Sequence, residues 1–183
     1  MKEENCIILD FLPNGYPDRR HAEPIAQAIG ATFFSLLELV PRENVSLNTQ
    51  EEAYIGEGKR DKIRFIRGQI GYNELTNMAR TILPEVVEDL VKRNEPRFIE
   101  FFNKATIVTP RMHQFQLLPG VGKKHLQDIM SERRKKPFQS FDDIRDRVKL
   151  FPDPLKTVVR RVVQEIENEE KYSLFVNKGK KKI

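Results

Sequence analysis

The sequence of 183 residues contains one cysteine, no tryptophan and three histidines. The single cysteine, Cys6, excludes a disulfide framework, and its place in the apolar run Cys6-Ile7-Ile8-Leu9 predicts a buried thiol. His21, His113 and His125 are scattered without metal-ligand spacing. We therefore expect no structural zinc site, no other metal and no cofactor.

Long apolar runs are also missing. No stretch of about 18 apolar residues occurs, which excludes a membrane-spanning helix. The start of the chain, Met1-Lys2-Glu3-Glu4-Asn5, lacks the apolar region of a signal peptide. The sequence thus predicts a cytoplasmic protein without a membrane partner.

Catalytic patterns are absent as well. Gly122-Lys123-Lys124 lacks the hydroxyl residue and the upstream glycine of a nucleotide-binding phosphate loop. The pair Asp142-Asp143 is weak support for a metal-dependent nuclease in a chain with 32% charged residues. We expect a protein that is not an enzyme.

What the chain has in excess is unevenly placed positive charge. Its net charge is +5, with 39% apolar residues, which is typical of a globular protein with a polar surface. Residues 1–110 carry 14 Lys/Arg against 17 Asp/Glu, whereas residues 111–161 carry 13 against 6. A basic segment of this kind favours a polyanionic partner.

The first 71 residues predict short strands. The segments are Asn5–Leu12, Ile25–Ile29, Thr32–Val40, Val45–Leu47, Ala53–Ile55 and Lys62–Ile70, which lie between turn residues. The residues of the second and third segments also allow helix, and we favour strand because Pro24, Gly30 and Pro41 leave no room for a long helix. The spacing of these segments predicts a small antiparallel β-barrel, and an oligonucleotide/oligosaccharide-binding (OB) type is the specific form we expect.

The last predicted strand and the loop before it form a second basic face of the barrel, which one interpretation assigns to nucleic-acid binding. The basic residues there are Lys59, Arg60, Lys62, Arg64 and Arg67. Neighbouring acidic residues, such as Glu51 and Asp61, support an ordinary salted surface equally well.

Residues 72–108 switch to helical periodicity. Leu75, Met78, Ala79 and Ile82 form one apolar stripe, and Pro84 is expected to open a second helix. A third helix near Glu95-Pro96 places several phenylalanines at helical spacing, which predicts a core rather than a base-stacking platform.

The motif that organises the chain is Leu118-Pro119-Gly120-Val121-Gly122-Lys123-Lys124. It separates an expected helix over Arg111–Leu117, capped by Thr109, from a helix that begins at Lys123. A helix start offers unpaired N–H donors and a partial positive charge, so this site suits an anion. The alternative is a helical corner whose glycines serve packing alone.

The motif resembles the hairpin of the helix-hairpin-helix family, whose members bind nucleic-acid backbone without reading sequence. Together with Ser140–Val148, the break Leu150-Phe151-Pro152-Asp153-Pro154 and the helix from Leu155, it resembles the doubled form of that module. The second break has no glycine and carries a carboxylate, so we interpret it as a structural half-repeat. Arg160 and Arg161 are expected to face solvent or a ligand.

Most of the chain also resembles an archaeal family known as domain of unknown function 655. The similar residues are Gly30 with 34–39, 54–56, 72–76, 97–99 with 101–103, the hairpin at 117–124, 137–138 with 140–141, and 171–176. It implies a β-rich N-terminal part fused to a helix-hairpin-helix part and a role in nucleic-acid binding.

The sequence therefore predicts an α+β multidomain protein. Its expected parts are a β-rich domain (1–71), connecting helices (72–108), an all-α helix-hairpin-helix domain (109–176) and a basic tail (177–183).

The expected function is non-enzymatic, largely sequence-independent binding of the phosphate backbone of RNA or DNA through the helix-hairpin-helix. The residues expected to bind are Pro119, Gly120, Val121, Gly122, Lys123, Lys124, Arg133, Arg134, Lys135 and Lys136. The alternative is a protein-protein interaction module with partners in translation or transcription.

Overall fold

The computed structural model describes residues 3–17, 23–167 and 170–177. The chain divides into two compact units. The first is formed by Met1–Val86, Glu165–Glu169 and Phe175–Ile183, and the second by Val87–Gln164 and Glu170–Leu174. The predicted segments 1–71, 72–108 and 109–176 remain a hypothesis about which parts fold separately, and the basic tail lies almost wholly outside the described residues.

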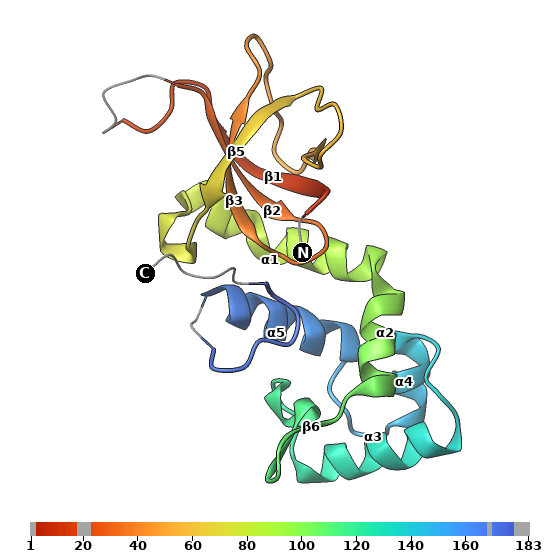
Figure 1. Cartoon of the computed structure of the whole chain (residues 1–183). Coiled ribbons are helices and arrows are strands. Elements are labelled where there is room, and N and C mark those ends of the chain that lie inside the picture. Colours follow the sequence, from red (N-terminus) through yellow and green to blue (C-terminus); the bar gives the residue numbers. More distant parts are fainter. Residues whose placement is uncertain (1–2, 18–22, 168–169, 178–183) are drawn as a thin grey trace. The chain divides into compact units, whose positions relative to one another are not determined.

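The first unit is built on a curled five-stranded antiparallel sheet, a half-barrel (Figure 1). Its strands are β1 (Asn5–Leu12), β2 (Ile25–Gly30), β3 (Leu36–Pro41), β4 (Glu52–Tyr54) and β5 (Ile63–Gln69). They lie in the order β4-β1-β2-β3-β5. The expectation of a small antiparallel β-structure is thus confirmed at this level. The strand expected at Val45–Leu47 is wrong, because this segment forms no strand in the structure.

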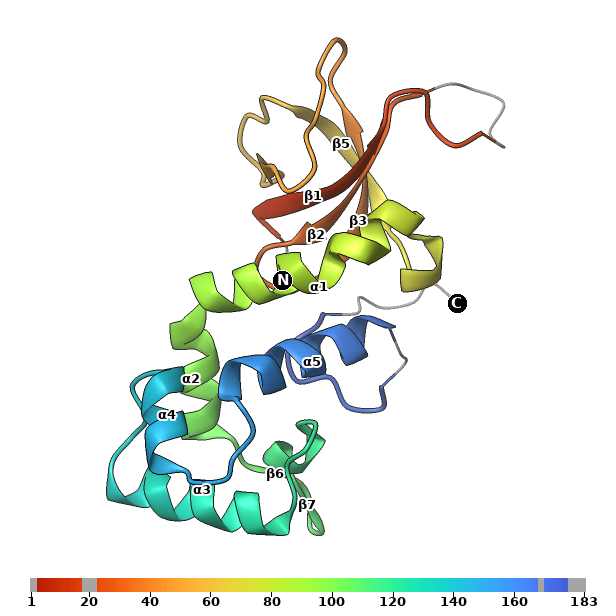
Figure 2. The ribbon, with the colours of Figure 1, turned by 180° about the vertical axis from the view of Figure 1, so that it is seen from behind.

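Both faces of the central strands are buried, which explains their nearly continuous apolar sequence. One face forms the main core of the unit, from Cys6, Ile8, Ala26, Ala28, Leu37, Leu39, Leu47, Ala53, Ile55 and Ile63. On the other face, Gln27 accepts from the backbone N–H of Thr76 at 2.8 Å and donates to the carbonyl oxygen of Glu74 at 2.8 Å. These bonds fix the segment that enters α1 (Asn77–Arg93), whose first half lies along the sheet (Figures 1 and 2).

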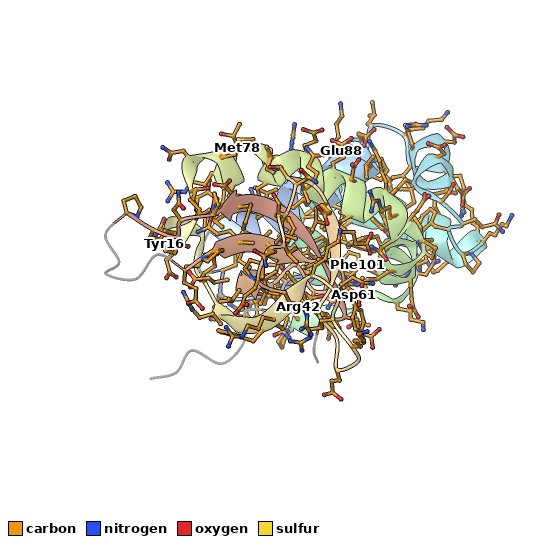
Figure 3. The ribbon with its side chains drawn as sticks, turned by 90° about the horizontal axis from the view of Figure 1, so that it is seen from above. Tyr16, Arg42, Asp61, Met78, Glu88 and Phe101 are labelled. Carbon is orange, nitrogen blue, oxygen red and sulfur yellow. The ribbon has the colours of Figure 1, made fainter. Side chains whose placement is uncertain are left out.

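The helix α1 is continuous through Pro84, so the predicted break at this proline is wrong. Pro84 is exposed, whereas Leu83 and Val86 beside it are buried. Packing of the buried stripe therefore maintains the helix despite the lost backbone hydrogen bond. Met78, expected within the stripe, is half exposed (Figure 3).

The second unit contains α2 (Glu95–Lys104), α3 (Lys123–Lys135), α4 (Phe141–Arg147) and most of α5 (Pro154–Glu167). Phe98 and Phe102 of α2 are fully buried, which confirms the predicted phenylalanine core. The Phe98 ring stacks on Phe141 with centroids 6.5 Å apart, and this contact joins α2 to α4.

The helix expected over Arg111–Leu117 is wrong. A short hairpin replaces its first half, with strands β6 (Ile107–Thr109) and β7 (Met112–His113), and the one-turn 3-10 helix η2 (Gln114–Leu117) follows (Figure 2). The β-branched run Ile107-Val108-Thr109 favours a strand, and Pro110 lies in the turn rather than at a helix start. His113 begins η2, because its Nδ1 accepts from the N–H of Phe115 at 3.2 Å.

Within residues 3–17, 23–167 and 170–177, no helix is both long and apolar enough to cross a membrane.

Candidate functional site

The predicted hairpin is a tight turn between η2 and α3. The N–H of Val121 donates to the carbonyl oxygen of Leu118 at 3.2 Å. Gly120 has a φ of +78°, a left-handed conformation that glycine adopts without strain. Leu118 and Val121 are buried and anchor the turn, whereas Gly122 is exposed at its end.

The start of α3 has no side-chain cap. Gly122 takes the capping position in an extended conformation, with φ −92° and ψ −176°. A side chain added at Gly122 would meet no atom within 4 Å, so the space in front of the helix is open. Lys123 and Lys124 in the first turn are exposed. The first N–H groups of α3 thus face open space beside two cations, as an anion site requires.

Of the other three helices that begin in this unit, α2 also lacks a side-chain cap but carries Glu95 and Pro96 in its first turn, whereas side chains cap α4 and α5. Ser140 Oγ accepts from the N–H of Asp143 at 3.0 Å at the start of α4. Asp153 Oδ1 accepts from the N–H of Lys156 at 2.9 Å at the start of α5. The carboxylate of Asp153 therefore occupies the N-terminal start of α5, and its negative charge would repel an anion there. This agrees with the interpretation of the second break as a structural half-repeat that does not bind phosphate.

The second break nevertheless repeats the turn of the first. The N–H of Phe151 donates to the carbonyl oxygen of Val148 at 3.3 Å, as Val121 donates to Leu118. Leu150, the third residue of this turn, has a φ of +63°. The same left-handed position is therefore filled by glycine in one loop and by leucine in the other.

His125 connects the two loops. Its Nε2 lies 3.0 Å from the carbonyl oxygen of Leu150, and its Nδ1 lies 3.4 Å from the N–H nitrogen of Gly122. Nδ1 also lies 3.1 Å from the carbonyl oxygen of Gly120. The tautomer protonated at Nε2 donates to Leu150 and accepts from Gly122, whereas a proton on Nδ1 would be donated to Gly120. A methyl group added at Gly120 would come within 3.4 Å of Cγ of Pro152, so the two loops lie close together.

Unpaired cations surround the joined loops. Among the described residues, four exposed lysine side chains there form no ion pair and no hydrogen bond: Lys123, Lys124, Lys149 and Lys156. Residues 118–126 include no carboxylate, and the only one in 148–156, Asp153, is used at the start of α5. The positive charge at this surface is therefore available to a ligand.

The basic run at the other end of α3 is largely engaged within the protein. Arg133 donates to the carbonyl oxygens of Phe102 and Ala105 at 3.3 and 2.9 Å, which closes the end of α2. Arg134 donates to the carbonyl oxygen of Met130 at 3.2 Å.

The rest of this run differs in its pairing and lies away from the hairpin. Lys135 pairs with Glu132, while Lys136 is exposed. Arg133 is about 15 Å along α3 from Lys123, given 1.5 Å of rise per residue. One phosphate cannot contact both ends of α3.

Two residues that the sequence pattern did not indicate hold this region in place. Arg161, expected to face solvent or a ligand, is buried and donates to the carbonyl oxygens of Leu117 and Tyr172 at 3.0 and 2.5 Å. It thereby fixes the residue that precedes the hairpin. His113 supports the same segment, and burial, followed by the charge of Arg133, lowers the pKa of its imidazole.

The basic side chains predicted to form the second basic face do not lie together on one side of β5. Bulges in the β3–β5 pairing fall at Arg64 and Arg67, which breaks the expected alternation along β5. Arg67 pairs with Glu38 at 3.0 Å and also with Glu23, and Lys62 pairs with Glu51.

The loop before β5 is also held by internal contacts. Arg60 donates to Gly56 at 2.7 Å. Arg42 lies close to Asp61 of this loop (Figure 3). The side chain of Arg42 donates to the carbonyl oxygen of Arg60, and its backbone N–H donates to the carbonyl oxygen of Lys62. Ion pairs therefore engage Lys62 and Arg67, and a backbone carbonyl oxygen engages Arg60, so three of the five basic side chains are held by internal contacts.

Among the described residues, no group of three or more His, Cys, Asp or Glu side chains is arranged to hold a metal ion.

Comparison with known proteins places the chain in a family. The model of the family described as "Protein of unknown function (DUF655)" matches residues 2–177. The chain belongs to this family. DUF655 relatives include the uncharacterized protein MJ0038 of Methanocaldococcus jannaschii, which is 42% identical over an alignment of 183 positions that covers 99% of this chain and 82% of that protein.

A solved DUF655 structure has the same fold. The crystal structure of Af1531 from Archaeoglobus fulgidus superposes with a TM-score of 0.87 at 42% identity and covers 96% of this chain and 100% of that one. The predicted membership of an archaeal DUF655 family is therefore confirmed.

Proposed function

We propose that this protein binds the phosphate backbone of RNA or DNA at the start of α3, without catalysis and largely without sequence preference. The observation that carries the proposal is the uncapped start of α3 at Gly122, open in front and flanked by the exposed Lys123 and Lys124. Backbone N–H donors and flanking lysines recognise phosphate oxygens, which are the same on every nucleotide.

The contrast with the starts of α4 and α5 supports this assignment, and α2, which also lacks a side-chain cap, has Glu95 and Pro96 in its first turn instead of lysines. Side chains cap α4 and α5, yet α3 has glycine at the position where serine or aspartate is usual. A glycine there contributes little to helix stability but leaves the N–H groups accessible to a ligand. The two lysines that follow add charge where the helix end already favours anions.

The repeated turn supports a doubled helix-hairpin-helix arrangement for the second unit. In this proposal η2, the loop Leu118–Gly122 and α3 form one half, and α4, the loop Val148–Asp153 and α5 form the other. A one-turn 3-10 helix in place of the first α-helix is a departure from that pattern. For the first unit we propose an OB-type form, since five curled antiparallel strands with β4 and β5 at the edges suit a partly open barrel.

The test uses two matched charge substitutions at helix starts. Gly122→Asp places a good capping residue in an extended backbone with open space, so the protein should remain folded while a carboxylate fills the anion site. Ser140→Asp adds the same charge at α4 and retains a cap there. Binding of a labelled RNA hairpin and a DNA duplex is measured by fluorescence anisotropy over a salt series.

We expect Gly122→Asp to weaken binding at least tenfold, while Ser140→Asp stays within about twofold of the wild type. On duplex DNA the wild-type log–log salt slope should be about −0.9 for each phosphate neutralised. A chain ending at Asn177 measures the contribution of the basic tail separately.

Equal binding by wild type and folded Gly122→Asp contradicts the proposal. No affinity for nucleic acid at low salt would favour the protein-interaction alternative, which the exposed Ile107 and Leu150 would then serve.

A further inference from the structure

Leu150 combines three properties that the fold alone does not require. Its side chain is 80% exposed, the highest fraction among the large apolar side chains described. Its φ of +63° is a conformation in which leucine is strained and glycine or asparagine is preferred. It also interrupts a surface of unpaired lysines, directly after Lys149. Strain at an exposed apolar residue indicates selection for something other than stability.

The surroundings of Leu150 are held by internal contacts. Its carbonyl oxygen accepts from His125 Nε2 at 3.0 Å, and the next residue, Phe151, is buried with its ring centroid 5.9 Å from that of His125. The same His125 contacts Gly122 at the start of α3. Leu150 is therefore presented from a fixed turn beside the proposed phosphate site.

A ligand that covers this surface must match both of its chemistries. The helix start and the lysines require negative charge, whereas Leu150 requires an apolar face close to that charge. A polyanion without rings, such as polyphosphate, satisfies only the first. A nucleotide satisfies both, because its base presents an apolar face close to its phosphate.

We propose that Leu150 contacts an unstacked base next to the phosphate held at α3, so that the protein prefers nucleic acid with opened or single-stranded bases. This inference rests on the proposed function. Leu150 then acts as a positioning and selectivity residue, in the way that apolar side chains enter base steps in other nucleic-acid-binding proteins.

The test compares four chains on two ligands. Leu150→Asn removes the apolar contact but tolerates the left-handed backbone, and Leu150→Met keeps an apolar side chain. Ile107→Asn is the matched control, because Ile107 is 70% exposed on β6, outside both joined loops. The ligands are an RNA hairpin with 2-aminopurine in its loop and inorganic polyphosphate.

Leu150→Asn should weaken RNA binding about tenfold and leave polyphosphate binding unchanged, since burial of a leucine side chain is worth at least that factor. Leu150→Met and Ile107→Asn should stay within about twofold of the wild type. The 2-aminopurine fluorescence should rise with wild type and less with Leu150→Asn at saturation, because the probe brightens when unstacked.

Two outcomes overturn the inference while the proposed function stands. One is a Leu150→Asn protein that binds RNA as tightly as the wild type, and the other is a Leu150→Asn protein that loses equal affinity for RNA and polyphosphate. Both count when Gly122→Asp weakens binding at least tenfold. If Gly122→Asp binds as the wild type does, or the wild type binds no RNA, the proposed function fails and the inference fails with it.

Discussion

Gly120 and Leu150 occupy the same position in two similar turns, with φ angles of +78° and +63°. In each turn the next residue donates its N–H to a buried residue two positions before the left-handed one. The loops lie close together at Pro152, and the imidazole of His125 lies within hydrogen-bond distance of the carbonyl oxygens of both Gly120 and Leu150. The helix after one turn is open to an anion, while the helix after the other is closed by Asp153.

The strain at Leu150 predicts a gain in stability on substitution. Leu150→Gly should raise the free energy of unfolding by about 0.5–1 kcal/mol, because relief of the left-handed backbone outweighs the entropy of glycine in the unfolded chain. Urea denaturation followed by circular dichroism measures the change. The same substitution at Leu155, half-buried in α5 with no positive φ, should destabilise and serves as the control. An unchanged or lower midpoint for Leu150→Gly would show that the turn carries no strain.

The two ends of α3 should respond oppositely to loss of charge. Arg133→Met should lower stability by about 1–3 kcal/mol, because the carbonyl oxygens of Phe102 and Ala105 lose their donor. Lys124→Met should leave stability within about 0.5 kcal/mol and weaken RNA binding. Thermal unfolding and anisotropy on the same samples distinguish these effects. A stable Arg133→Met protein with normal melting would remove the structural role assigned to Arg133.

His113 predicts acid sensitivity. Burial, followed by the charge of Arg133, lowers the pKa of His113 in the folded state. At a pH below 6.5, the ordinary pKa of histidine, the unfolded chain therefore binds the proton more readily than the folded chain does. The stability that this group contributes is present above pH 6.5 and is lost as the pH falls below it. His113→Asn keeps an acceptor for the N–H of Phe115 without titrating. Urea midpoints of both proteins at pH 7.5 and 5.0 should therefore fall more for the wild type; parallel falls would exclude this role.

Cys6 predicts protection of its thiol. Burial, with a smaller contribution from Glu3, raises the pKa of Cys6 to about 12. The folded protein should then react with a thiol reagent at pH 8 only through unfolding, so labelling should accelerate across the urea transition. Between the ordinary thiol pKa and about 12, stability should decline as pH rises, because only the unfolded chain forms the thiolate. Fast labelling in native buffer would contradict the burial.

The sequence predicted those features that depend on local pattern. Apolar and alternating runs indicated all five strands of the sheet, and Pro119 with Gly120 indicated the turn before α3. Local pattern failed where distant residues decide the outcome. Packing on both sides of Pro84 keeps α1 continuous, and the turn at Leu150 forms without glycine.

Charge was the least predictable property of the candidate site. Arg133 and Arg161 look like ligand-binding cations in the sequence, yet each donates to carbonyl oxygens far away along the chain. No spacing rule connects Arg161 to Leu117, because that contact depends on tertiary structure. The lysines beside the hairpin, by contrast, are exposed as their local pattern suggests.

The central claim is that N–H groups at the start of α3 hold phosphate, and amide chemical shifts report on these groups directly. In a ¹H–¹⁵N titration with a short RNA, the largest shifts should fall on Gly122, Lys123, Lys124 and His125. The amide of Leu150 should show a smaller change in chemical shift, and the chemical shifts of the amides at the starts of α4 and α5 should not change. If the RNA binds and those four amides do not move, while β5 or the C-terminal residues do, the account is contradicted.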